Sequence, residues 1–186
     1  MSLDLVLLGN LLVDDVVHAD GSTRMGEAGG AMLYSALGAA LWGLTVGVVS
    51  VAGSDYPAAT LDALATRGID LGGVRPLGRP GVRTWLLYEG AARRVVHHLG
   101  CPTHTEVSPV PTDIPGAYAA ARAFHVAPIP LESQRLLLEH LAATRRDALV
   151  SVDPHEPVRE ETLTEWRAVL ENAVVHGKGQ PVLVRS

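Results

Sequence analysis

The sequence predicts an α/β fold in which a mostly parallel sheet is flanked by helices and carries a small β lid. Two apolar runs, residues 3–8 and 45–51, each end at a glycine-containing turn, as buried strands do. Helical patterns lie between these runs and after the second one, and the alternation of strand and helix resumes near residue 124. This alternation is typical of a parallel sheet with crossover helices.

The first half of the chain supplies two strands and two helices. A strand over 3–8 ends at Gly9-Asn10, and a second strand over 45–51 ends at Ala52-Gly53. The helix between them starts after Gly29-Gly30, and its apolar face is predicted from Leu33, Leu37, Ala40, Leu41 and Leu44. A second helix is expected over 56–67, with Ser54 and Asp55 capping its start and Gly68 its end.

The middle of the chain interrupts this alternation. Residues 82–99 read as two strands joined at Glu89-Gly90, and both faces of this hairpin carry polar and apolar residues. This pattern is more typical of a hairpin that leaves the main sheet and covers another part of the protein than of a strand at the centre of a sheet. The proline-rich segment 102–115 is expected to return to the main body as a loop.

The second half resumes the pattern. Strands are predicted over 124–127 and 148–152, the latter ending at Asp153, with a helix over 132–146 between them. A last helix is expected over 162–171 and a last strand over 182–184.

The composition indicates which classes of binding partner and which compartment to expect. The net charge is −5 and the 15 Lys and Arg residues form no basic block, so we expect no nucleic-acid partner. No apolar run approaches the roughly 18 residues of a membrane helix, and the N-terminus lacks the basic region of a signal peptide. The single cysteine, Cys101, fits a reducing compartment, and we expect a cytoplasmic protein.

No metal site is expected from the histidines. His97 and His98 are adjacent, so in a strand they point to opposite faces and are expected to be solvated. Nucleophilic triads and phosphate loops are not supported either, because the sequence lacks a G-x-S-x-G elbow and a G-x-x-x-x-G-K-[ST] loop.

Three positions are candidates for binding. Gly29-Gly30 stands at a helix start, where unpaired N–H groups could meet a hydroxyl or an anion, or where the glycines serve only a tight turn. Asp14 follows the first strand, at the sheet edge where ligands bind in open α/β sheets; it is either a hydroxyl acceptor or a solvated turn residue beside Asp15. Asp153 is equally a site residue or part of a plain turn.

Taken in order, these features resemble the ribokinase-like (PfkB) family of carbohydrate kinases. "LVLLGNLLVD", ending at Asp14, is similar to the opening strand, glycine and substrate aspartate of the family. "GGAMLYSALGAALWGLTVGVVSVAGSD" is similar to its first signature and to the Gly-x-Asp that follows. "LDALATRGID", "RTWLLYEGAARR" and "ALVSVDPHE" are similar to a helix, the lid strands and a later strand ending in Asp. Six motifs in the family's order span residues 3–156.

The resemblance implies a sugar or nucleoside site. Asp14 would bind hydroxyls, and Gly29 and Gly30 would bring backbone against them. Segments of about 15–25 and 82–99 would form the lid. Tyr34 stands where family members often carry Asn, which puts the usual sugar preference in doubt.

The resemblance also implies that the ATP half is missing. Complete members use ATP and Mg and continue into an Asn-x-x-Glu element and a Gly-Ala-Gly-Asp anion hole with the catalytic base, whereas this sequence holds no Gly-Asp dipeptide. We therefore expect residues 1–186 to form one truncated domain. This domain should contain no catalytic residue and should bind ATP poorly. Two interpretations stay open: a truncated or split sugar kinase, or a non-catalytic sugar-binding or protein-interaction module. Truncation also leads us to expect a homodimer through the lid or an exposed sheet edge.

Overall fold

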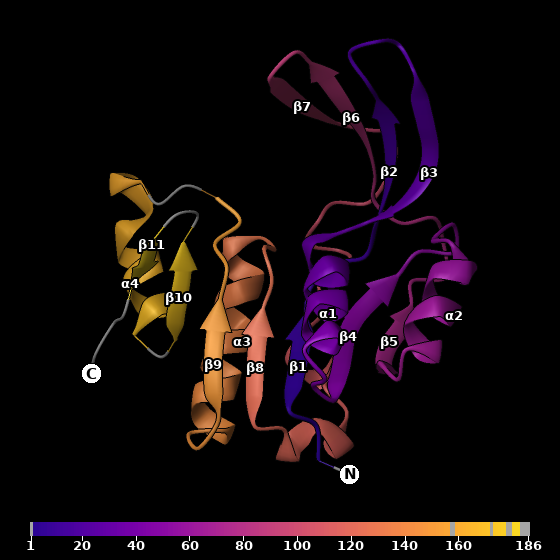
Figure 1. Ribbon diagram of the computed structural model, residues 1–186. Coiled ribbons are helices and arrows are strands. Elements are labelled where there is room, and N and C mark those ends of the chain that lie inside the picture. Colours follow the sequence, from indigo (N-terminus) through magenta and orange to yellow (C-terminus); the bar gives the residue numbers. More distant parts are fainter. Residues whose placement is uncertain (1, 157–158, 172, 178–179, 183–186) are drawn as a thin grey trace.

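The chain folds around a seven-stranded sheet with a smaller sheet above it. A computed structural model describes residues 2–156, 159–171, 173–177 and 180–182. The strand order of the large sheet is β11-β10-β9-β8-β1-β4-β5, and its pairs are parallel except β10–β11 (Figure 1). The strands are β1 (Leu5–Leu8), β4 (Val46–Ala52), β5 (Asp70–Pro76), β8 (Ala123–Val126), β9 (Leu149–Val152), β10 (Val174–Gly177) and β11 (Gln180–Val182).

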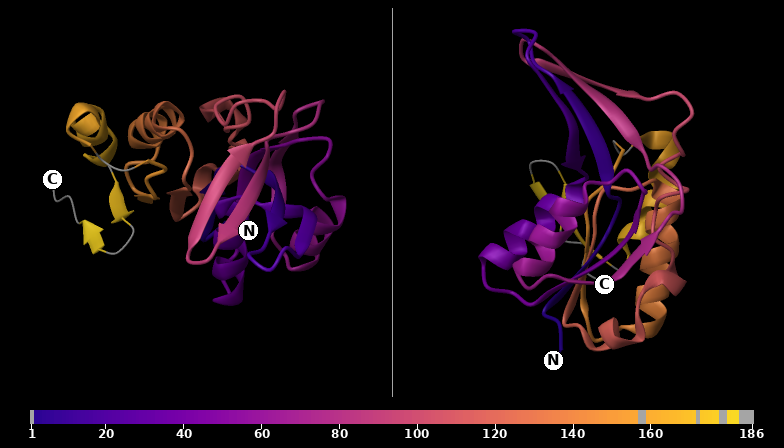
Figure 2. Two further views of the ribbon diagram at one scale, coloured as in Figure 1. Left: turned by 90° about the horizontal axis from the view of Figure 1, so that it is seen from above. Right: turned by 90° about the vertical axis from the view of Figure 1, so that its right-hand side faces the viewer.

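Helices cover both faces of this sheet. Helices α1 (Ala31–Leu41) and α2 (Ala58–Thr66) lie on one face, and α3 (Leu131–Thr144) and α4 (Leu163–Leu170) on the other (Figure 2). Alternate residues of β1 serve the two layers: Leu7 packs with Met32 and Leu33 of α1, whereas Val6 and Leu8 belong to the cluster that contains the leucines of α3. Three short 3₁₀ turns complete the described helical segments: Pro111–Asp113, Gly116–Ala120 and Glu160–Thr162.

A second sheet of four strands, which we call the lid sheet, stands above the carboxyl ends of the parallel strands (Figure 1). Its order is β3-β2-β6-β7, from β2 (Leu12–Val17), β3 (Thr23–Gly29), β6 (Arg83–Glu89) and β7 (Ala92–His97). Strands β6 and β7 form the antiparallel hairpin that the sequence predicted, and β2 pairs parallel with β6. The fold class predicted from the sequence is therefore confirmed, including the small β lid.

Several sequence predictions are wrong in detail. Leu41 and Leu44 do not extend the buried face of α1: they are 88% and 42% exposed, because the helix ends at Leu41 and its buried residues are Met32, Leu33 and Ala36. The second helix begins at Ala58 after Pro57, and no side chain caps it. Asp55 instead accepts a hydrogen bond from the backbone N–H of Gly81 at 2.7 Å.

The remaining elements match the expected order. β8, α3, β9 and α4 lie within a few residues of their predicted bounds, and Gly68 follows α2 with φ +78°. The predicted strand over 182–184 overlaps β11 only at Val182, because residues 183–184 lie outside the described part. Strands β2, β3, β5 and β10 were not predicted. Among the described residues, none of the helices combines the length and the hydropathy that spanning a membrane requires.

Candidate functional site

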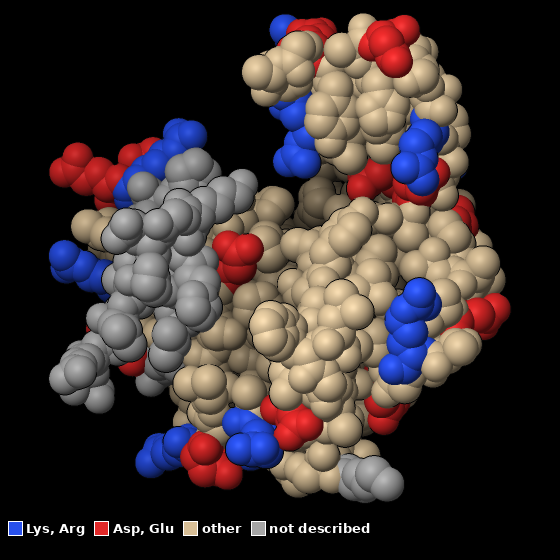
Figure 3. Space-filling model, in the orientation of Figure 1, with Lys and Arg blue, Asp and Glu red and all other residues tan. Residues whose placement is uncertain are grey.

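A cavity of about 670 Å³ lies between the lid sheet and the main body. The space-filling view shows the molecule hollowed at this place (Figure 3). Segments that follow β1, β8 and β9 contribute to its wall, and ligands of open α/β sheets bind at this edge. The body contributes Asn10, Gly30, Ala31, Tyr34, His104, Pro128 and His155, and the lid sheet contributes Leu12, Asp14, Thr84, Leu86, Tyr88, Arg93, Val95 and His97.

Asp14 is the carboxylate of this cavity. It lies in β2, directly opposite Thr84 of β6, and its Oδ1 accepts a 2.5 Å hydrogen bond from the Thr84 hydroxyl. Burial raises the pKa of Asp14, and the Thr84 hydroxyl and the positive charge of Arg93 oppose that rise. Asp14 follows the first strand, as expected, but the alternative interpretation as a solvated turn residue is wrong, because Asp14 lies within a strand of the lid sheet.

Gly29 makes room for that carboxylate. A Cβ atom at Gly29 would overlap the Asp14 side chain. Any other residue at position 29 would therefore displace the carboxylate. The absence of a side chain at this position serves the placement of Asp14.

Gly30 serves the turn from β3 into α1. Its φ is +104°, a conformation that favours glycine, and a Cβ atom there would overlap the backbone carbonyl oxygen of Asn10. Gly30 and Ala31 also line the cavity, and no side chain caps the start of α1. Backbone at the helix N-terminus thus borders the cavity, as expected from the sequence, while a substitution at Gly30 would first meet the protein itself.

Asn10 adds a second acceptor. Its side chain is 4% exposed, and its Nδ2 donates a 3.1 Å hydrogen bond to the carbonyl of His104. This contact fixes the amide, and its Oδ1 has no partner among the described residues. Asn10 was not among the predicted site residues, and its place at the end of the first strand was the one signal that could have indicated it.

Two tyrosines stand near the acceptors. Tyr34 of α1 lines the cavity and is 63% exposed, so it occupies the rim. The hydroxyl of Tyr56 is buried without a hydrogen-bond partner in the described part of the chain. Burial raises the pKa of Tyr56, and Tyr34 and Asp14 add to that rise, which places this hydroxyl within electrostatic reach of Asp14.

Asp15, the next residue, has a different role. Its carboxylate is 1% exposed and accepts two hydrogen bonds of 2.7 Å from Arg83 and one of 2.8 Å from the backbone N–H of Gly26. His98 Nε2 lies 3.0 Å away, and the His98 ring stacks on Trp85. These contacts, the Arg83 hydrogen bond above all, lower the pKa of Asp15. Through Arg83 and Gly26, the Asp15 side chain connects three strands of the lid sheet, β2, β6 and β3.

Three histidines gather on the cavity wall. His97 Nε2 of β7 lies 2.8 Å from His104 Nε2, and the ring centroids of His104 and His155 are 5.5 Å apart. Burial, with His155 and His97 nearby, lowers the pKa of His104 to about 4. The prediction that His97 and His98 are solvated holds for His97, which is exposed although it also contacts His104. It is wrong for His98, which is partly buried beside Asp15.

The other candidates lie outside this arrangement. Cys101 is a free cysteine whose Sγ lies 3.9 Å from the carbonyl of Arg83, and it does not line the cavity. Asp153 follows β9, and its carbonyl accepts a hydrogen bond from Gln134. Only Asp14, Gly29, Gly30 and Tyr34 of the predicted residues come together here.

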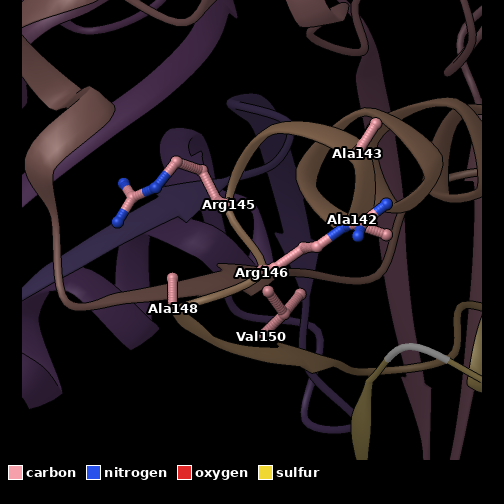
Figure 4. A pocket seen from close by; sticks show the side chains of 6 residues that line it. All are labelled: Ala142, Ala143, Arg145, Arg146, Ala148 and Val150. Carbon is pink, nitrogen blue, oxygen red and sulfur yellow. The ribbon is translucent and has the colours of Figure 1, made fainter.

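A second hollow, of about 460 Å³, lies where α3 turns into β9. Alanines and Val150 line it together with Arg145 and Arg146, whose side chains point in different directions (Figure 4). Arg145 is engaged within the protein, with Ala121, Asp147 and the Phe124 ring. This hollow offers no converging set of polar groups.

The described residues form neither a metal-ion cluster nor a nucleotide-binding phosphate loop. The described part of the chain contains no group of three or more His, Cys, Asp or Glu residues arranged to hold a metal ion. The sequence contains neither a Gly-Asp dipeptide nor a phosphate loop. No ATP-dependent step is therefore assigned to the cavity.

Known proteins resemble this chain over most of its length. A curated relative, cytidine kinase of Thermococcus kodakarensis, is 34% identical over 161 residues, which cover 86% of this chain and 54% of the relative. The PfkB protein of Polaromonas sp. JS666 superposes with a TM-score of 0.73 at 20% identity, over 94% of this chain and 65% of that one. A putative Ribokinase II from E. coli gives 0.72 at 16% identity, over 95% and 62%.

The matches span most of this chain but only part of each similar protein. The chain spans about half the length of the curated relative and less than two thirds of the two solved structures. No family model matches the sequence.

Proposed function

The chain belongs to the ribokinase-like (PfkB) carbohydrate kinase family, and from this premise we propose that it forms the substrate-binding part of a kinase that phosphorylates a hydroxyl of a sugar or nucleoside. In this proposal the chain binds the hydroxyl-bearing substrate on its own and transfers no phosphoryl group on its own. In this proposal ATP and Mg belong to the complete enzyme; of the solved structures that resemble the chain, one is a complex with ATP and another a complex with ATP and Mg.

The observation that carries the proposal is the placement of Asp14. A carboxylate has about four lone-pair positions, of which Thr84 uses one on Oδ1. The remaining positions can accept hydrogen bonds from ligand hydroxyls. The unpartnered Oδ1 of Asn10, on the main-body side of the cavity, provides a further acceptor.

Within this class a nucleoside fits the cavity better than a bare sugar. The lid sheet, which also carries Asp14, lines the cavity with Leu86, Tyr88 and Val95. A sugar offers little apolar surface to such a wall, whereas a base can pack against it. The curated relative is named as a cytidine kinase, which favours the same choice.

The absence of phosphoryl transfer follows from chemistry that this sequence lacks. Transfer needs groups that stabilise the charge of the phosphoryl group and a base that takes the hydroxyl proton. The family supplies both from a Gly-Ala-Gly-Asp element, and no Gly-Asp dipeptide occurs here. The second interpretation, a non-catalytic module, has no observation of its own in its favour.

Calorimetric titration of the chain against a panel of pentoses, hexoses and nucleosides, without ATP, tests the proposal. We expect at least one nucleoside to bind, and no product to form when ATP and Mg are added. Lack of binding across the panel would contradict the substrate site. Robust turnover by this chain alone would contradict the assignment of catalysis to residues outside it.

A further inference from the structure

The cluster of His97, His104 and His155 joins three separate segments of the chain. His97 belongs to lid strand β7, His104 to the loop after that strand, and His155 to the segment that follows β9. All three line the same cavity as Asp14. The proposed function, which uses the acceptors of this cavity, leaves these side chains without a role.

We propose that these three histidines bind a phosphomonoester group, so that the cavity takes the phosphorylated form of its sugar or nucleoside ligand. The ligand class rests on the proposed function, whereas the anion site rests on the histidines alone. The ligand would direct its free hydroxyls toward Asp14 and its phosphate toward the histidines, because a carboxylate and a phosphate repel one another.

The geometry gives the cluster converging donors. The Nε2 atoms of His97 and His104 are 2.8 Å apart, so one ring donates to the other. The His155 ring lies beside His104 at a centroid distance of 5.5 Å. Two hydrogen bonds fix the backbone of His104: its carbonyl accepts from Asn10 at 3.1 Å and from the Ser108 hydroxyl at 2.8 Å.

His104 has no carboxylate partner among the described residues. The pKa of His104 is lowered by burial and by two other histidines, and no carboxylate of the described residues raises it. The charged groups on neighbouring elements are Arg93 of β7 and Asp14 of β2 on the cavity wall, Glu106 of the His104 loop, and Asp153 and Glu156 after β9. Glu106 is engaged with Thr103 and Arg79.

A phosphate dianion would supply the missing counter-charge. It removes part of the burial cost of an imidazolium and converts the repulsion between neighbouring histidines into shared attraction. The histidine cluster would then take up protons on binding, so affinity would rise as the pH falls from 8 to 6. Phosphate has its second pKa near 6, so the ligand remains at least singly charged over this range. Arg93 adds a permanent positive charge on the same cavity wall.

Titration of the full chain with cytidine, cytidine 5′-monophosphate and inorganic phosphate, each at pH 6 and pH 8, tests this inference. Two buffers of different ionisation enthalpy report the protons taken up. At pH 6 we expect the monophosphate to bind about ten-fold more tightly than cytidine, as for a charge-assisted hydrogen bond, with a smaller margin at pH 8. His155→Gln and His97→Gln should remove this margin, whereas His140→Gln on α3 should not change it.

The outcomes separate the two proposals. Cytidine binding with no preference for the monophosphate at pH 6 would overturn the inference and leave the proposed function standing. Phosphate binding with proton uptake, but without cytidine binding, would support the histidine site and contradict the nucleoside assignment. Binding of neither phosphate nor monophosphate at either pH would overturn the inference.

Discussion

Asp14 and Thr84 lie directly opposite one another in the parallel pair β2–β6, and the Thr84 hydroxyl donates a 2.5 Å hydrogen bond to the Asp14 carboxylate. The two residues are 70 positions apart in the sequence, so the pairing depends on the lid sheet being formed. The orientation of the carboxylate toward the cavity is therefore a property of the folded lid.

Thr84→Val should loosen this carboxylate. The variant removes a hydrogen bond that lowers the pKa of Asp14, so that pKa should rise further, as measured by NMR titration of the carboxyl carbon. Ligand affinity should fall about five-fold, because losing the hydrogen bond that orients the carboxylate should cost about 1 kcal/mol of binding free energy. Thr23→Val, on the exposed part of the same sheet, serves as the control. An unchanged Asp14 pKa in Thr84→Val would contradict the role of the hydroxyl.

The glycine pair should respond to alanine in two different ways. Gly29→Ala should displace the Asp14 carboxylate and weaken ligand binding, with a moderate loss of stability. Gly30→Ala combines a positive φ with a clash against the Asn10 carbonyl, and it should lower the free energy of unfolding by about 1–3 kcal/mol. Gly38→Ala within α1 meets open space and should be neutral or stabilising.

Denaturant unfolding of the three glycine variants checks this order. The clash of Gly30→Ala is with the protein's own backbone, so its stability loss should appear in the absence of any ligand. Full stability of Gly30→Ala would contradict the strained turn between β3 and α1.

Asp15→Asn should destabilise the lid sheet. The change removes the charge that Arg83 and His98 contact, and because Arg83 is partly exposed we expect a cost of about 2 kcal/mol rather than the 3–5 of a fully buried pair. Because the pKa of Asp15 is lowered in the folded protein, its stabilisation is present above the unfolded pKa and lost as the pH falls through the folded value. The difference in unfolding free energy between the wild type and Asp15→Asn should therefore be smaller at pH 3 than at pH 7. A constant difference between them would contradict this ion pair.

The outer edge of β7 should mediate self-association. This strand ends the lid sheet, all its described residues are exposed, and Val95 and Val96 are 48% and 46% exposed. Val96→Lys should shift the association equilibrium toward monomer in sedimentation experiments, whereas Leu41→Lys, at the end of α1, should not. A wild-type chain that stays strictly monomeric at high concentration would contradict the expectation of a dimer through this edge.

The sequence predicted the elements whose burial follows a simple period. Strand β1 is apolar, β4 is buried along its whole length, and α3 carries Leu137, Leu138 and Leu141 on one face. Strand β5 was missed because Gly72 and Gly73 interrupt its pattern, and β3 because it is largely exposed at its start. Local patterns describe a residue's neighbours along the chain, and these strands are stabilised by partners far from it.

The site was predicted in part for the same reason. Asp14 and the glycine pair stand in a continuous motif, so the sequence indicated them together. Thr84, His104 and His155 join them only through the packing of the lid and of the loop after β7. No spacing in the sequence predicts that His104 and His155, which are 51 positions apart, share a wall.

Asp14 should cost the protein stability. Because burial raises its pKa, its contribution to stability falls as the pH rises from the unfolded toward the folded pKa and stays low at neutral pH. Asp14→Asn should therefore match or exceed the wild type in unfolding free energy at pH 7, as expected for a residue kept for function. Asp62→Asn, on the exposed face of α2, is the control. A clearly less stable Asp14→Asn protein would indicate a structural role instead.

The central claim, that Asp14 binds the hydroxyls of a nucleoside, is tested most directly by calorimetric titration of the wild type and Asp14→Asn with the tightest nucleoside of the panel. Loss of a charged acceptor from two hydrogen bonds costs about 2–3 kcal/mol, so affinity should fall roughly 30- to 150-fold while the variant stays folded. Equal affinity of Asp14→Asn and the wild type would contradict the claim and place the ligand elsewhere.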